Sequence, residues 1–244
     1  MSAEPVPASY NAALTARRAD LKNLSACWRE FFKHFSPRVV LTAAGVALTA
    51  RIVVGRWSWH DALVPFVIIA LQPFVEWVIH RYLLHMPPLR IFGRRVELYG
   101  SVQHRRHHRS PSELDRVLLK PIEVTSFIVQ IAAVAAALTW GAVALAGGHF
   151  VPLWLTAVVL SYLGLFRYEA SHFLIHTPYV PRTRWYRTIW RNHRLHHYKH
   201  EGYWLGVSSN LGDRVLRTNP DQRAVAKSPT ARTLGVETVG VETE

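Results

Sequence analysis

Four long apolar stretches alternate with polar, histidine-rich segments along the chain. As helices rising about 1.5 Å per residue, they cross or nearly cross the hydrocarbon core of a bilayer. The third ends in a glycine pair and the fourth begins near Pro152, so a tight turn is expected between them. The stretches are 39–55, 62–79, 122–148 and 151–166. We therefore predict an all-α integral membrane protein with four transmembrane helices in two hairpins.

Composition supports a membrane protein. Half of the 244 residues are hydrophobic and only 18% are charged, which is below the quarter usual in soluble domains. Arg51 lies near the end of the first stretch, where its long side chain is expected to reach the membrane interface. The single cysteine, Cys27, excludes an intramolecular disulfide framework and a Cys-rich zinc or iron–sulfur site within one chain.

Lys and Arg follow the expected topology, which accounts for the net charge of +13. Six lie in residues 1–38, eight in 86–121 and twelve in 167–244, whereas the two turns at the opposite ends of the spans hold one together. With four spans the three basic regions lie on one side, and the positive-inside bias makes that side cytoplasmic. We expect both termini and the histidine-rich cap there, and no nucleic-acid partner.

Two regions flank the predicted membrane domain of residues 39–217. Residues 1–38 lack the continuous apolar core of a secretory signal, so we expect no cleaved leader. From Leu21 to Phe35, apolar residues recur every three or four positions, which predicts an amphipathic helix lying on the membrane or packing on the protein. Residues 218–244 lack a long periodic apolar pattern, and we predict a disordered tail.

Histidines gather beyond the cytoplasmic ends of the spans. Residues three and four apart share a helical face, so each HxxHH motif presents three imidazoles together and HxxxH presents two. His80 and His85 are five apart, about 140° around an ideal helix, so either the helix ends there or the two rings approach a site from different sides. The four groups are His80 and His85; His104, His107 and His108; His172 and His176; and His193, His196 and His197.

Ten imidazoles in one layer favour a metal site. A basic surface run would explain a single triplet but not four groups with ordered spacing. Iron, zinc and copper all accept imidazole, and ten nitrogen donors exceed the four or five that one zinc binds. We therefore expect two metals. Two redox metals beside lipid favour oxygen chemistry on an alkyl chain. A carboxylate-bridged di-iron site is the competing form, but its ExxH signature occurs only once, at Glu169 and His172.

Two glutamates share a helical face with these histidines: Glu76 precedes His80 by four residues, and Glu169 precedes His172 by three. We predict that each carboxylate accepts an imidazole N–H and raises the basicity of that ligand. The alternative is a buried acid paired with Arg81 or Arg167. After the last triplet, Tyr203 and Trp204 are expected either to line a substrate entry or to anchor at the membrane interface.

The motifs HRYLLH, HRRHH, YEASHFLIH and HRLHH, within about residues 70–215, resemble those of the fatty acid hydroxylase and sterol desaturase superfamily of membrane non-haem di-iron enzymes. Their spacing is most similar to the branch that hydroxylates fatty acyl chains. The resemblance implies that all ten grouped histidines ligate two iron ions, with zinc as a substituted metal. It also implies O2 as co-substrate and insertion of oxygen into a C–H bond of a lipid chain in the bilayer.

The resemblance further implies an electron donor. Relatives of the 2-hydroxylase type often carry a fused cytochrome b5 domain, for which the 38-residue N-terminal region is too short. A separate ferredoxin, cytochrome or flavoprotein reductase is therefore expected. A desaturase or sterol methyl oxidase of the same superfamily is the first alternative. A zinc-binding, non-redox membrane scaffold or transporter is the alternative from another class, weakened because no ionisable residue is clearly placed in mid-span.

Overall fold

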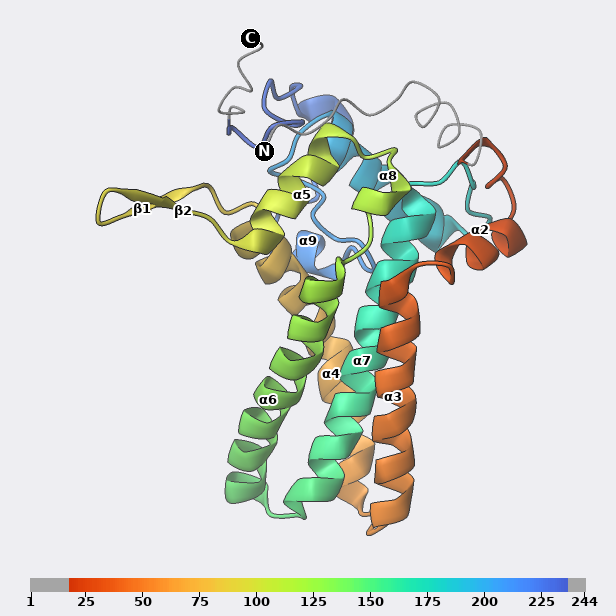
Figure 1. Cartoon of the computed structure of the whole chain (residues 1–244), viewed down its shortest axis with the longest axis vertical. Coiled ribbons are helices and arrows are strands. Elements are labelled where there is room, and N and C mark those ends of the chain that lie inside the picture. Colours follow the sequence, from red (N-terminus) through yellow and green to blue (C-terminus); the bar gives the residue numbers. More distant parts are fainter. Residues whose placement is uncertain (1–17, 237–244) are drawn as a thin grey trace.

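The computed structural model describes residues 18–236. Four long helices lie side by side and carry a layer of shorter helices at one end (Figure 1). Each of the four is long and apolar enough to cross a membrane, which confirms the predicted all-α membrane protein with four spans. A π-helical turn, η1 (Ile79–Leu84), continues the second. The four helices are α3 (Phe35–Val54), α4 (Trp59–Val78), α6 (Pro121–Ala146) and α7 (Phe150–Ile175).

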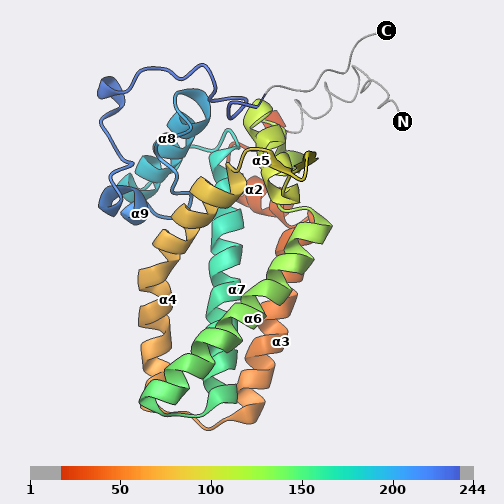
Figure 2. The same ribbon diagram turned by 90° about the vertical axis from the view of Figure 1, so that its left-hand side faces the viewer.

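Helix α7 lies at the centre of the bundle and packs on α3, α4 and α6. Small residues such as Ala44 of α3 and Ala135 of α6 are buried near Val158 and Tyr162 of α7, and such residues let helices approach closely in a membrane. Apolar side chains such as Phe66 face outwards, as lipid contact requires. Figure 2 shows α6 crossing in front of α7, so that the upper ends of α4 and α6 diverge to opposite sides of α7.

Arg51 lies in the last turn of α3, where its side chain is enclosed by the protein. Its guanidinium is buried and donates to the carboxylate of Asp61 at 2.7 Å and to Thr156 Oγ1 at 2.8 Å. Asp61 lies in the first turn of α4, where it also accepts the amide of Ser58. The turn between α3 and α4 thus brings a buried acid within reach of the arginine, and the pair joins three helices.

The N-terminal amphipathic segment packs on the protein. Helix α2 (Leu24–Phe31) is capped at its N-terminus by Asn23, whose side chain accepts a hydrogen bond from the amide of Ala26. It buries Phe31 against Phe173 of α7, with ring centroids 5.4 Å apart. The helix ends at Phe31, so it is shorter than the predicted periodic segment, whose last residue, Phe35, is the first of α3. Residues 1–17 of this region lie outside the described part of the chain.

The layer at the end of the bundle, here called the cap, comes from two parts of the sequence. Between α4 and α6 lie a short hairpin and a helix, and after α7 lie two further helices and the C-terminal segment (Figure 1). These elements are β1 (Leu89–Ile91), β2 (Arg94–Val96), α5 (Tyr99–Arg109), η2 (Leu114–Arg116), α8 (Arg184–Tyr198), α9 (Leu211–Val215) and η3 (Gln222–Ala224).

The predicted disordered tail is wrong for residues 218–236, which cross the cap. Ala231 is buried, and the amide of Ser228 donates to the carbonyl of Lys199 at 2.8 Å. The Ser228 and Thr230 hydroxyls both donate to Glu201. These hydrogen bonds need no periodic apolar pattern, which is why hydropathy did not reveal the segment. The rest of the predicted tail, 237–244, lies outside the described residues.

Candidate metal centre

The ten predicted histidines converge where the cap meets α4 and α7. They form two groups of five, and within each group one nitrogen per ring lies within 4.8 Å of the others. All are buried except His85, which is half-buried. The first group is His80, His85, His104, His108 and His196, and the second group is His107, His172, His176, His193 and His197.

Each HxxHH triplet divides between the two groups. Helix α5 gives His104 and His108 to the first group and His107 to the second, while α8 gives His196 to the first and His193 and His197 to the second. The three rings of each triplet lie on one face of their helix. That face therefore supplies rings to both groups. His108 and His197 lie across the boundary with ring centroids 4.2 Å apart, so the groups are neighbours.

His80 and His85 reach the same group because the chain between them is π-helical. The amide of His85 donates to the carbonyl of His80 at 3.2 Å, an i to i+5 bond. The wider turn brings the two rings to a centroid separation of 4.9 Å. The helix ends at Leu84, directly before His85. Of the two alternatives that the spacing of five left open, the structure therefore shows the first, a helix that ends between the two histidines.

Backbone carbonyls orient three rings of the first group. The Nδ1 atoms of His80, His108 and His196 lie 2.5, 2.8 and 2.9 Å from the carbonyl oxygens of Leu205, Ala231 and Tyr203. A carbonyl can only accept, so each Nδ1 carries the proton and each Nε2 presents a lone pair. Yet Nε2 of His196 lies 3.2 Å from Nε2 of His108. Two lone pairs facing each other in a buried site call for a cation.

The second group shows the same need for a cation. Buried imidazole nitrogens are normally hydrogen-bonded. Both nitrogens of His107, Nε2 of His172 and His176, and Nδ1 of His193 and His197 are buried without a hydrogen-bond partner among the described residues. All of these nitrogens belong to imidazole, a ligand suited to iron, zinc and copper. The side chains of both groups therefore fit a pair of transition-metal ions.

Burial keeps these imidazoles neutral. It lowers the pKa of His108 to about 3, and it lowers the pKa of His85, His104 and His107 well below 6.5, with further lowering by neighbouring histidines. The pKa values of His176, His193, His196 and His197 are lowered well below 6.5 by the same causes. Neutral imidazoles present the lone pair that a metal ligand must offer.

The prediction that the two glutamates accept hydrogen bonds from imidazole N–H groups is wrong. Glu76 accepts hydrogen bonds from the Val207 amide and, at 2.8 and 2.5 Å, from the amide and hydroxyl of Ser208. Glu169 accepts from the Ser36 hydroxyl at 2.5 Å and the Leu119 amide at 3.0 Å. In the part of the chain that the structure describes, neither carboxylate accepts from an imidazole.

Glu76 instead supports the site through the backbone of residues 203–208. Carbonyls of this segment orient His80 and His196, as described above. Its amides are held by two carboxylates: Asp213 accepts those of Leu205 and Gly206 at 2.9 and 2.7 Å, and Glu76 accepts the next two. Sequence reasoning missed Asp213 and all three carbonyls, because these roles leave no spacing or residue-type signal.

Trp204 has a structural role in the same segment. Its side chain is 1% exposed, and its indole N–H donates to the carbonyl of Pro220 at 3.2 Å. Its amide donates to the carbonyl of Thr218 at 2.8 Å. Neither of the predicted roles, lining an entry or anchoring at the interface, describes a side chain enclosed in this way.

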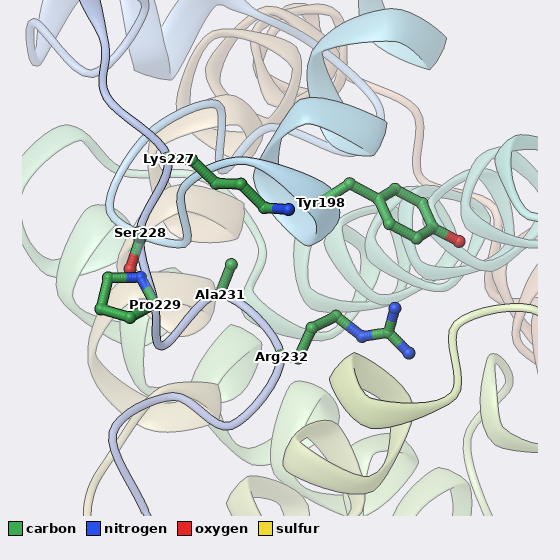
Figure 3. Close-up of a pocket in the computed structure, with 6 residues that line it drawn as sticks. All are labelled: Tyr198, Lys227, Ser228, Pro229, Ala231 and Arg232. Atoms are coloured by element: carbon green, nitrogen blue, oxygen red, sulfur yellow. The ribbon is translucent and has the colours of Figure 1, made fainter.

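One cavity adjoins the histidines, and a second hollow opens on the surface of the cap. A small one of about 40 Å³ lies between α5, the start of α6 and α7, and its walls include His104, His107, His172, Tyr168 and Gln103. A wider hollow of about 460 Å³ opens on the cap between the end of α8 and the C-terminal segment (Figure 3). It is lined by Tyr198, Lys227, Ser228, Pro229, Ala231 and Arg232. The Ala231 backbone links this hollow to His108.

Residues 65–218, which include all ten histidines, match the family model described as fatty acid hydroxylase. The chain belongs to the fatty acid hydroxylase family. It is 26% identical to mouse fatty acid 2-hydroxylase over 148 residues, 59% of this chain and 36% of that protein. It is also 26% identical to the dihydroceramide fatty acyl 2-hydroxylase FAH1 of Arabidopsis thaliana over 171 residues, 68% of this chain and 65% of that protein.

These hydroxylase relatives are longer than the matched region, and the chain spans little more than a third of the mouse protein. Among solved structures, the chain is similar to full-length scs7p, of which only the hydroxylase domain is visible. The TM-score is 0.55 at 20% identity, covering 78% of this chain and 66% of that one. This likeness supports the same fold.

Proposed function

We propose that this protein is an O2-dependent hydroxylase that uses two iron ions to insert oxygen at carbon 2 of a fatty acyl chain. The observation that carries the proposal is the pair of five-histidine groups, in which buried imidazole nitrogens converge. Membership of the fatty acid hydroxylase family supports the substrate class, and the printed names of the relatives support carbon 2.

The ten histidines would hold the two irons, five to each. Iron bound there would supply the one-electron and O2 chemistry that amino-acid side chains lack. The protein's own part is to fix the rings: the carbonyls of Tyr203, Leu205 and Ala231 set the tautomers of three ligands. Burial of the site excludes water, which protects reactive species from side reactions.

The acyl chain would enter from the bilayer between the upper ends of α4 and α6, which diverge in front of α7 (Figure 2). The small cavity beside His104, His107 and His172 lies at the upper end of this route. Tyr168 lines it from α7 and Leu84 from the end of η1. A chain held there presents one carbon at a fixed place, so positioning supplies the selectivity.

The reaction consumes one O2 and two electrons with two protons, and it yields the hydroxylated lipid and one water. A separate ferredoxin, cytochrome or flavoprotein reductase would supply the electrons from the cytoplasm. We place the cap, both termini and the iron site on that side because 26 of the 29 Lys and Arg lie in the three regions expected there. Residues 39–217 would form the catalytic unit, completed by the C-terminal segment.

The test is expression in a host that lacks 2-hydroxylated lipids, together with an active ferredoxin and reductase, under oxygen-18 gas. We expect fatty acyl chains to gain one labelled oxygen at carbon 2, measured by tandem mass spectrometry of the lipids. His107→Ala should abolish the product. The exposed His149, in the turn between α6 and α7, provides the control, and His149→Ala should retain activity.

Other outcomes distinguish the rival functions. Loss of two hydrogens without labelled oxygen would identify a desaturase, and label on a sterol methyl group would identify a sterol oxidase. Purified protein that contains zinc, with no lipid change while the donor is active, would support the non-redox scaffold. Each of these results would overturn the proposed hydroxylation.

A further inference from the structure

The hairpin of β1 and β2 projects from the cap into open space (Figures 1 and 2). Leu89 pairs with Val96, Arg90 with Arg95 and Ile91 with Arg94. Directly paired residues point to the same face of a hairpin. One face therefore carries Leu89, Ile91 and Val96 with Arg94, and the other carries the Arg90–Arg95 pair.

The hairpin exposes apolar surface that nothing in the described chain covers. Phe92 at its tip is 100% exposed, and Leu89, Ile91 and Val96 are each more than 40% exposed. Single exposed apolar residues are common, but a contiguous apolar patch usually marks an interaction site. Four such residues within eight positions, on a hairpin of only two strands, form such a patch.

The geometry of the turn does not favour a phenylalanine at the tip of the hairpin. Phe92 and Gly93 have φ values of +48° and +76°, the left-handed pair found in a two-residue hairpin turn of type I′. Such turns favour Asn or Asp before Gly, and a bulky residue is strained there. A fully exposed phenylalanine that opposes the local preference indicates a contact made outside the chain.

The hairpin's position makes the bilayer surface its nearest partner. Strand β1 begins five residues after Leu84, the last residue of the second candidate span. Exposed apolar residues continue on both sides of the hairpin, with Leu83 before it and Leu98 and Tyr99 after it. In Figure 1 the hairpin projects sideways at about the level of the upper end of α7, above the upper ends of α3 and α6.

The charges of the hairpin suit anionic headgroups. Arg90 and Arg95 oppose each other directly, and like charges in that position repel. Arg95 is compensated by Glu97 at 2.6 Å, whereas Arg90 and Arg94 have no ionic partner among the described residues. Arg readily binds phosphate oxygens through its forked donors. A lipid phosphate would therefore compensate the free arginines while the apolar face meets the acyl boundary.

We infer that the β1–β2 hairpin is a membrane-surface element, which inserts Phe92 and the Leu89–Val96 face into the headgroup boundary and binds lipid phosphates through Arg90 and Arg94. This surface is independent of the proposed hydroxylation. It anchors the cap against the bilayer beside the end of α4, at the side where the upper ends of α4 and α6 diverge (Figure 2).

The test uses an environment-sensitive fluorophore on the full-length protein in vesicles of phosphatidylcholine with phosphatidylglycerol. The one native cysteine, Cys27, is buried, so Phe92→Cys can be labelled selectively. Asp221→Cys, exposed on the C-terminal segment of the cap, is the matched control, and Val96→Cys is a second hairpin probe should the first misfold. We expect blue-shifted emission at positions 92 and 96, quenching by lipids spin-labelled near the headgroup, and little quenching by iodide.

The control at position 221 should show the reverse pattern. Arg90→Glu with Arg94→Glu should reduce lipid quenching at position 92, most strongly in the vesicles that contain phosphatidylglycerol. Iodide quenching at position 92 equal to that at position 221, without lipid quenching, would overturn the inference. Shielding that depends on protein density in the vesicle would assign the hairpin to a second copy, and shielding that requires an added protein would assign it to a partner; either result would also overturn it.

Discussion

The amide of His85 donates a hydrogen bond to the carbonyl of His80, five residues earlier, at 3.2 Å. This bond belongs to the π-helical turn η1, which continues α4 into the cap. In a regular α-helix the two rings would point in different directions, whereas here both enter the first histidine group. Isolated π-helical turns are rare and frequently occur at functional sites.

The division of the histidines into two groups predicts that single substitutions remove one metal of two. His85→Ala truncates a ring of the first group only, and His176→Ala one of the second only. We expect each variant to lose about half of the bound metal, because the ligands of the other group are retained. Elemental analysis by mass spectrometry of protein purified in detergent measures the ratio.

His149 again provides the control, since it lies in neither group and His149→Ala should keep the full metal content. Wild-type content in either of the two site variants would contradict the assignment of its ring as a ligand. Complete metal loss in both variants, with the helical circular dichroism signal retained, would show that the two groups bind only as a unit.

Sequence periodicity identified the parts of the site that obey a repeating geometry. The apolar stretches gave the four spans, and the spacings of three and four put His104, His107 and His108 on one face. Sequence periodicity could not show that His80 and His85 share a group, because a π-helical turn has no hydropathy signature. The carbonyl partners of the rings were equally hidden, since every residue has a carbonyl. The segment containing Ala231 lacks a periodic apolar pattern, which is why the sequence predicts disorder there.

Gly206 is predicted to be required for the segment that orients His80 and His196. A Cβ at this position would lie 2.1 Å from the carbonyl oxygen of Ser209 and 2.9 Å from Asp213 Oδ2. Gly206→Ala must therefore displace backbone, and we expect it to lower the free energy of unfolding by about 3 kcal/mol, the upper end for overpacking. The unfolding temperature measured in detergent and the metal content should both decrease.

Gly45 is the matched position, because a Cβ there would meet nothing within 4 Å. It lies inside α3, where replacing Gly by Ala gains up to about 1 kcal/mol of helix propensity. Gly45→Ala should therefore leave stability unchanged or raise it. Equal unfolding temperatures for Gly206→Ala and the wild type would show that the 203–208 segment tolerates displacement.

Acid should destabilise the metal-free protein. Burial lowers the pKa of His108 to about 3 and lowers that of His104 and His197 well below 6.5. The unfolded chain titrates near 6.5, so below that pH it binds more protons than the folded one. The free energy of unfolding then falls by about 1.4 kcal/mol per pH unit for each such ring. Above pH 7 these rings do not make the free energy of unfolding depend on pH.

Urea unfolding of chelator-treated protein at pH 7.5, 6.5 and 5.5 measures this dependence. We expect little change between the first two values and a steep loss by the third. Protein that retains its metal should keep its resistance to urea at lower pH, because bound metal competes with protons for the same nitrogens. Equal stability of the metal-free protein at pH 6.5 and 5.5 would contradict the neutral, buried state of the rings.

The C-terminal segment is predicted to hold metal in the first group. The carbonyl of Ala231 lies 2.8 Å from Nδ1 of His108 and fixes its tautomer, and loss of such a partner typically weakens metal binding about 10- to 100-fold. Deleting residues 227–244 removes this carbonyl and uncovers His108, so we expect faster metal loss to a chelator from the first group while the second retains its metal. Deleting 237–244, beyond the described residues, keeps Ala231 and should leave the release rate unchanged. Equal release from the two truncated proteins would show that α5 alone orients His108.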